Sequence, residues 1–108
     1  MTIRINANLI DSWSSFHQVF KIALGFPEFY NANMDAWNDC MSYIDDPTSE
    51  MTRNTVKSGQ TVIIELINAD IFKIKHENIY HTILDCVALI NRRKIEDKTR
   101  TLIAIASL

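Results

Sequence analysis

The stretch TVIIELI, residues 61–67, is a continuous apolar run rich in β-branched residues, with Glu65 as its one charge. Such a run is typical of a strand that lies in a parallel sheet and is covered on both faces. Two other stretches, TIRIN (2–6) and TLIAIAS (101–107), also have the composition of strands. We therefore predict three strands, with 61–67 buried on both sides.

Helical patterns fill the sequence between these strands. Apolar residues recur at helical spacing over 16–24, and Gly25 ends that pattern because it tolerates the left-handed conformation after a helix. A second apolar stripe runs over 34–44, and the longest pattern covers about 77–92. The segment 68–75 has room for a short helical turn.

The predicted order is therefore β-α-α-β-α-β. Strands separated by helices require crossover connections, and crossovers give parallel pairing. We expect an α/β fold: a three-layer-like small domain with a three-stranded parallel sheet and packed helices. Because compact domains centre on about 100–150 residues, the 108 residues are interpreted as a single domain, 1–108.

Composition limits the classes of function. The net charge of −2 argues against a nucleic-acid-binding domain, which is usually basic. The chain has only two glycines, which stand apart, so neither a P-loop nor a dinucleotide-binding loop is present. Two cysteines are too few for a disulfide framework, and no apolar run is long enough to span a bilayer. We expect a cytoplasmic protein that is monomeric when free and binds neither membrane nor nucleic acid directly.

The helix over 34–44 carries polar residues on the side opposite its apolar stripe. The members of this polar face are Asp35, Asn38, Asp39, Ser42 and Asp46. The helix dipole accounts for Asp35 near the start, but Asp39 repels it from one turn away, where a lysine would be more stable. This face is either a solvated surface or a binding surface for a partner.

The loop before this helix, which contains Phe29 and Tyr30, favours the second interpretation. The loop is too short and polar to bury both rings, so we expect one ring to pack against the core. Exposed aromatic side chains beside carboxylates are typical of an interface hot spot.

The sequence gives little support for a catalytic site or a metal site. The histidines and cysteines lack the paired short spacing of zinc ligands, so we predict no metal site. Cys40 and Cys86 lie in apolar helical patterns, as inert core thiols do. Nothing near Asp35 and Asp39 would separate their pKa values into an acid and a base. The basic cluster Arg92–Lys94 suits a helix C-terminus, with nucleic-acid binding as a weaker alternative.

Residues 16–46, which begin with FHQVFKIALGFPEFYNANMDAWNDC, resemble the barstar family most strongly; its members are small intracellular inhibitors of barnase-type ribonucleases. The shared features are the helix, the Pro-Glu-aromatic-Tyr loop and the Asn-apolar-Asp-Ala start of the next helix. The order of elements agrees over the whole chain, and residues 47–98 agree in pattern only.

The resemblance implies that the second helix and its preceding loop plug the active site of a ribonuclease. Asp39 would then occupy the pocket of the scissile phosphate, and Asp35 would face basic catalytic residues. Phe29 would stack on catalytic side chains. The residues implied at the border of the contact are Asn33, Asn38, Ser42, Tyr43 and Asp46. Tyr30, next to Phe29 in the loop, is also among the predicted partner-binding residues.

The chain also departs from the family pattern. Asn31 and Ala32 stand where the family has a glycine and an acid, and Trp37 lies one place before the family's tryptophan. An acid near the end of the family's last helix falls here in the cluster Arg92–Lys94, and the loop leading to the second strand is longer. These changes make the surface less acidic, so the partner need not be barnase itself.

We therefore predict a protein inhibitor of a ribonuclease toxin, without catalytic residues or cofactor. The nearest alternative keeps the fold and changes the partner, giving an immunity protein against a different secreted or contact-delivered toxin. A third alternative is a small enzyme that depends on cysteine or aspartate.

Overall fold

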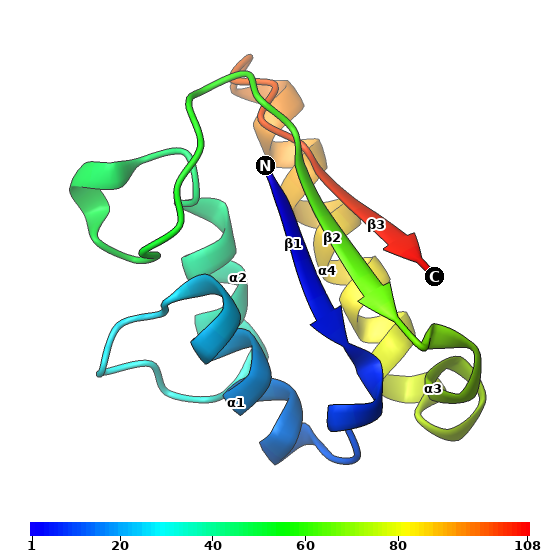
Figure 1. The fold of residues 1–108 in the computed structure, drawn as a ribbon. Coiled ribbons are helices and arrows are strands. Elements are labelled where there is room, and N and C mark those ends of the chain that lie inside the picture. Colours follow the sequence, from blue (N-terminus) through cyan, green and yellow to red (C-terminus); the bar gives the residue numbers. More distant parts are fainter.

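A computed structural model describes residues 1–108. Three parallel strands, β1 (Thr2–Asn6), β2 (Val62–Ile67) and β3 (Ile103–Ser107), form one sheet in the order β1-β2-β3 (Figure 1). β2 is central and pairs on both sides, with Ile64 opposite Ile3 of β1 and Ile105 of β3. The longest β-branched run of the sequence therefore forms the middle of the sheet.

Helices make the connections between the strands. They are α1 (Trp13–Leu24), α2 (Met34–Ser42), α3 (Ala69–Lys75) and α4 (Glu77–Glu96), with 3-10 turns at Ala7–Leu9 and Pro47–Ser49. α1 packs against β1, α4 packs against β3 and α2 contacts α4 (Figure 1). The predicted α/β class, parallel sheet and β-α-α-β-α-β order are confirmed, and the turn expected after β2 is the short helix α3.

The prediction that residues 61–67 are covered on both faces is wrong, and with it the three-layer-like arrangement. Val62, Ile64 and Leu66 are fully buried, whereas Ile63 is 37% exposed and Glu65 forms an ion pair of 3.0 Å with Arg4 on the open face. The strand order explains this. Both crossovers step in the same direction, and right-handed crossovers in one direction place their helices on one face. The fold therefore has two layers.

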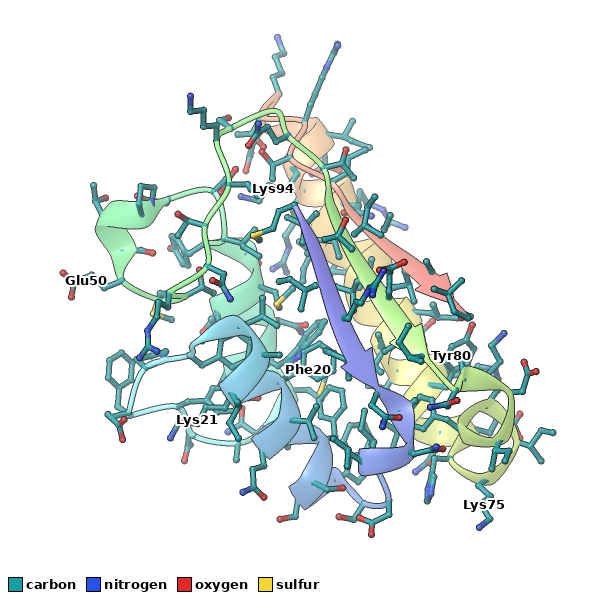
Figure 2. The ribbon with its side chains drawn as sticks, viewed as in Figure 1. Phe20, Lys21, Glu50, Lys75, Tyr80 and Lys94 are labelled. Carbon is teal, nitrogen blue, oxygen red and sulfur yellow. The ribbon has the colours of Figure 1, made fainter.

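The core lies between the covered face of the sheet and the helices. Aromatic rings join α1 to α2: Phe20 lies 4.8 Å from Phe16 and 5.5 Å from Trp37 between ring centroids. All three side chains are fully buried, and Figure 2 shows Phe20 on the inner side of α1. Buried aromatic pairs contribute area and about 0.5–1.5 kcal/mol each beyond it. This contact fixes which side of α2 faces inward.

The long segment before β2 returns to the end of α1, where Gly25 caps the helix with φ +70°. The amide of Arg53 donates to the carbonyls of Leu24 and Gly25 at 3.1 and 3.0 Å, and Asn54 Nδ2 donates to Ala23 O at 2.8 Å. A Cβ atom at Gly25 would lie 2.4 Å from Arg53 Cβ. Gly25 is therefore required both by its backbone conformation and by the close approach of this segment, whose outer end carries Glu50 (Figure 2).

Gly25→Ala should destabilise the fold more than Gly59→Ala. Both glycines have positive φ, but the nearest atom to a Cβ at Gly59 is Thr99 O at 3.9 Å. The left-handed conformation costs a non-glycine residue about 1–2 kcal/mol, and overpacking adds roughly 1–3 kcal/mol at Gly25 only. Urea denaturation measures the difference. Equal losses in the two variants would show that the segment does not press on Gly25.

Candidate partner-binding surface

Asn33 sets the start of α2. Its backbone is extended, and its Oδ1 accepts a hydrogen bond of 2.8 Å from the amide of Ala36. An asparagine N-cap satisfies one of the free amides of the first turn. From this start, Trp37, Cys40 and Met41 point into the core. The predicted apolar stripe is confirmed, and the opposite side of the helix is left to solvent.

Asp35 and Asp39 are exposed on that opposite side, one turn apart. Neither carboxylate lies within 4.0 Å of a lysine, arginine or histidine nitrogen, since the ion pairs of the chain involve other residues. Asn38 and Ser42 are half-buried beside them, and Ser42 Oγ donates to Asn38 O at 2.6 Å. α2 thus presents two carboxylates without a cation of its own to neutralise them.

The two rings of the loop before α2 have different environments. Phe29 is 76% exposed. Tyr30 packs on Phe26, with ring centroids 4.8 Å apart, and its hydroxyl lies 2.5 Å from Nδ1 of His17. Burial raises the pKa of Tyr30 and lowers that of His17, so this pair is neutral at neutral pH. The prediction that one ring packs against the core is confirmed, and Phe29 is the ring left free.

Backbone strain also marks this loop. Ala32 has φ +47°, a left-handed conformation that alanine rarely adopts. The Tyr30 amide donates to Pro27 O at 2.9 Å, and the Tyr30 hydroxyl meets His17 on α1. These contacts hold the loop in one shape and so hold Phe29 outward.

At the C-terminal end of α2, the nearby carboxylate of Asp46 is hydrogen-bonded within the chain. Tyr43, the C-cap residue, is 47% exposed. Asp46 is half-buried, and its Oδ1 accepts hydrogen bonds from the amide and the hydroxyl of Thr48 at 3.1 and 2.6 Å. The carboxylate of Asp46 therefore caps the 3-10 turn that follows, unlike the carboxylates of Asp35 and Asp39.

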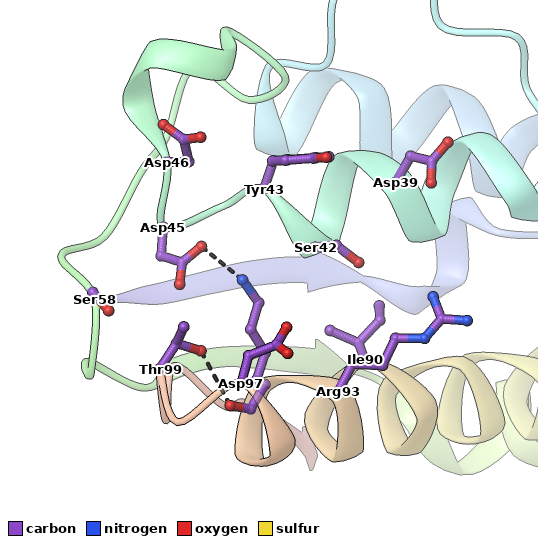
Figure 3. Close-up of a pocket in the computed structure, with 11 residues that line it drawn as sticks. Asp39, Ser42, Tyr43, Asp45, Asp46, Ser58, Ile90, Arg93, Asp97 and Thr99 are labelled. Carbon is purple, nitrogen blue, oxygen red and sulfur yellow. Dashed lines mark hydrogen bonds and ion pairs between the residues drawn. The ribbon is translucent and has the colours of Figure 1, made fainter.

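A cleft of about 480 Å³ separates this end of α2 from the last turns of α4 (Figure 3). Its lining residues are Asp39, Ser42, Tyr43, Asp45, Asp46, Ser58, Ile90, Arg93, Lys94, Asp97 and Thr99. Four of the residues expected at the interface meet here, namely Asp39, Ser42, Tyr43 and Asp46. The other five, Phe29, Tyr30, Asn33, Asp35 and Asn38, lie outside the cleft, along the loop and the earlier part of α2.

The three residues of the basic cluster Arg92–Lys94 lie in different places relative to this cleft. Lys94 Nζ lies 2.8 Å from Asp45 Oδ1, and the two side chains are only 14% and 8% exposed. Arg93 lines the cleft, whereas Arg92 is exposed outside it. The sequence did not identify Asp45, Arg93 and Asp97 as neighbours of α2. The only signal for them in the sequence was the basic cluster Arg92–Lys94 at the end of α4.

The cysteines have the environment of core thiols. Cys40 is buried, which raises the pKa of its thiol to about 11, and burial also raises the pKa of Cys86. Both thiols are therefore protonated at neutral pH, whereas a nucleophilic cysteine requires a thiolate. The structure contains no cluster of three or more histidine, cysteine and acidic side chains arranged to hold a metal ion. None of its helices has the length and apolar character needed to cross a membrane.

Comparison with protein families agrees with this architecture. The family model described as Barstar (barnase inhibitor) matches residues 1–106, so the chain belongs to the barstar family. The resemblance that is strongest in residues 16–46 thus extends over nearly the whole chain. The description gives barstar as an inhibitor of barnase. The search of curated proteins gave no match.

Removing the carboxylate of Asp45 should destabilise the fold strongly. Asp45→Asn leaves the Lys94 ammonium largely buried without its counter-charge, which costs about 3 kcal/mol in comparable cases. The double variant Asp45→Leu/Lys94→Met removes both charges and should recover most of that loss. Urea denaturation of the three proteins measures the difference. If the single and double variants lose the same free energy of unfolding, the cost does not come from an unpaired Lys94 ammonium.

Proposed function

We propose that the chain binds a ribonuclease toxin and blocks its active site with α2 and the loop before it. Membership in the barstar family supports an inhibitor of this kind. The observation that carries the binding mode is Asp39: its carboxylate is exposed and unpaired, on a helix whose other side is fixed by the buried Trp37 and Met41.

The chemistry of a ribonuclease explains why such a carboxylate would bind. An enzyme that cleaves RNA holds phosphate groups with cationic side chains, and those cations form strong charge-assisted hydrogen bonds with a carboxylate as well. Asp39 supplies the anion without a bond that the enzyme can cleave. Asp35, one turn earlier, adds a second anion for the same cationic cleft.

The surroundings of Asp39 suit an interface. Phe29 offers an exposed ring that a partner can cover, and Tyr43 offers a second at the other end of α2. Asn33, Asn38, Ser42 and Tyr30 would lie at the border, and Asp46 would add charge while its carboxylate stays bonded to Thr48. Because α2 is already ordered, binding avoids the entropy cost of ordering a loop.

The cellular setting follows from the same proposal. An inhibitor of this kind protects the cell that makes the ribonuclease, so we place it in the cytoplasm as a single domain over 1–108, monomeric when free. Two free cysteines agree with a reducing compartment. The role assigned to it is binding, with no cofactor and no reaction of its own.

Asp39→Ala should weaken binding to the ribonuclease by about 2 kcal/mol or more, which is roughly 30-fold in Kd. That magnitude is the one found for interface hot spots in general, complexes of this family included. The melting temperature should stay the same or rise slightly, because the substitution removes repulsion from Asp35. The ribonuclease is isolated from the native cell on the immobilised chain, and its inhibition is measured with RNA as substrate.

Asp70→Ala is the matched control, since it removes the same charge from an exposed position on α3. It should leave Kd unchanged. A loss of stability in Asp39→Ala without a loss of affinity would make Asp39 a structural residue and contradict the proposal. A captured partner that does not cleave RNA would keep the binding surface but replace the ribonuclease by another toxin.

A further inference from the structure

Arg93 introduces a positive charge into the proposed binding surface. It comes from α4 and lines the cleft together with Asp39 and Tyr43. Figure 3 shows its guanidinium extending from α4 toward α2, on the side of the cleft where Asp39 lies. A partner that covers Asp39 therefore also meets Arg93.

The guanidinium of Arg93 has no partner within the chain. No carboxylate lies within 4.0 Å of it, although Asp97 follows one turn later and lines the same cleft. The neighbouring Lys94 is already paired with Asp45. Arg93 thus keeps its whole fork of N–H donors free, and this fork matches a carboxylate through two parallel hydrogen bonds.

The helix dipole favours a cation at this position but does not decide which way its side chain extends. Arg93 and Lys94 both lie in the last turn of α4, where a cation gains a few tenths of a kcal/mol from the dipole. Arg92 is also exposed but lies outside the cleft. The two arginines therefore carry the same charge at adjacent positions, but only Arg93 is placed where a bound partner would touch it.

The position of Arg93 does not fit a partner ribonuclease whose active-site cleft is cationic throughout. Cations arranged to bind RNA would attract Asp39 and repel Arg93, and like charges brought together at an interface are strongly unfavourable. We propose, on the basis of the proposed function, that the partner ribonuclease carries an acidic side chain on the wall of its active-site cleft, and that Arg93 pairs with it. Arg93 is then the residue that selects among ribonucleases.

The selection works by repulsion as well as by attraction. A ribonuclease with the acid gains a bidentate ion pair, and one without it meets an unpaired cation in a desolvated interface. The chain therefore distinguishes its own ribonuclease from others that bind RNA phosphate in the same way. Asp39 provides affinity for ribonucleases in general, and Arg93 provides specificity for the ribonuclease that carries the acidic side chain.

The test compares Arg93→Glu with Arg92→Glu, which makes the same change of charge outside the cleft. Two probes are used: the ribonuclease isolated on the chain, and barnase, the enzyme that the family description names. Arg93→Glu should weaken inhibition of the isolated ribonuclease by at least about 30-fold and strengthen inhibition of barnase by about 10-fold. Arg92→Glu should change both by less than about 3-fold at 0.15 M salt. Arg93→Lys, which keeps the charge without the fork, should lose affinity for the isolated ribonuclease but less than Arg93→Glu.

Two results overturn the inference: equal effects of Arg93→Glu and Arg92→Glu on the isolated ribonuclease, or no gain of Arg93→Glu over Arg92→Glu against barnase. The variant Asp39→Ala is measured in the same assay. If Asp39→Ala weakens inhibition while Arg93→Glu behaves like Arg92→Glu, the proposed function stands and only the role of Arg93 fails. If Asp39→Ala has no effect, the proposed function itself fails.

Discussion

The packing of Trp37 against Phe16 and Phe20 is the contact on which the proposed binding surface depends. Trp37 is fully buried, so α2 cannot rotate about its axis without exposing this ring. Asp35 and Asp39 lie on the opposite side and are held outward by the same contact. The core of the protein and the orientation of its carboxylates are therefore one structural feature.

Residues of α4, far along the sequence, also contribute to the charge of this surface. Lys94 neutralises Asp45, and the pair joins α4 to the segment just after α2, 49 positions earlier in the sequence. Asp46 is bonded to Thr48. The carboxylates that stay free, Asp35 and Asp39, are those closest to the aromatic loop. α2 thus carries two free carboxylates on one side, and Arg93 of α4 lines the cleft together with Asp39.

Much of this was predictable from local patterns. The apolar spacing of 34–44 gave the inward and outward sides of α2, Gly25 gave the end of α1, and the polarity of the loop indicated that one of Phe29 and Tyr30 is buried. The coverage of the sheet was not predictable in this way. TVIIELI reads as a strand buried on both faces, and only the strand order shows that both crossovers use one face.

The contribution of α4 to the cleft could not be predicted from the sequence for a related reason. Arg92, Arg93 and Lys94 are adjacent and chemically alike, and a helix turns by about 100° between neighbours, so each points elsewhere. Which of them meets α2 depends on how the two helices pack. Sequence spacing within α4 gives the relative directions of the three cations, but the position of α2 depends on its packing against α1 and α4.

A crystal structure of the chain bound to the ribonuclease of the proposed function tests the central claim most directly. The account predicts the carboxylate of Asp39 inside the active-site cleft, at about 3 Å from at least two cationic side chains that otherwise hold phosphate. A complex in which Asp39 and Asp35 face solvent while another surface makes the contact would contradict it.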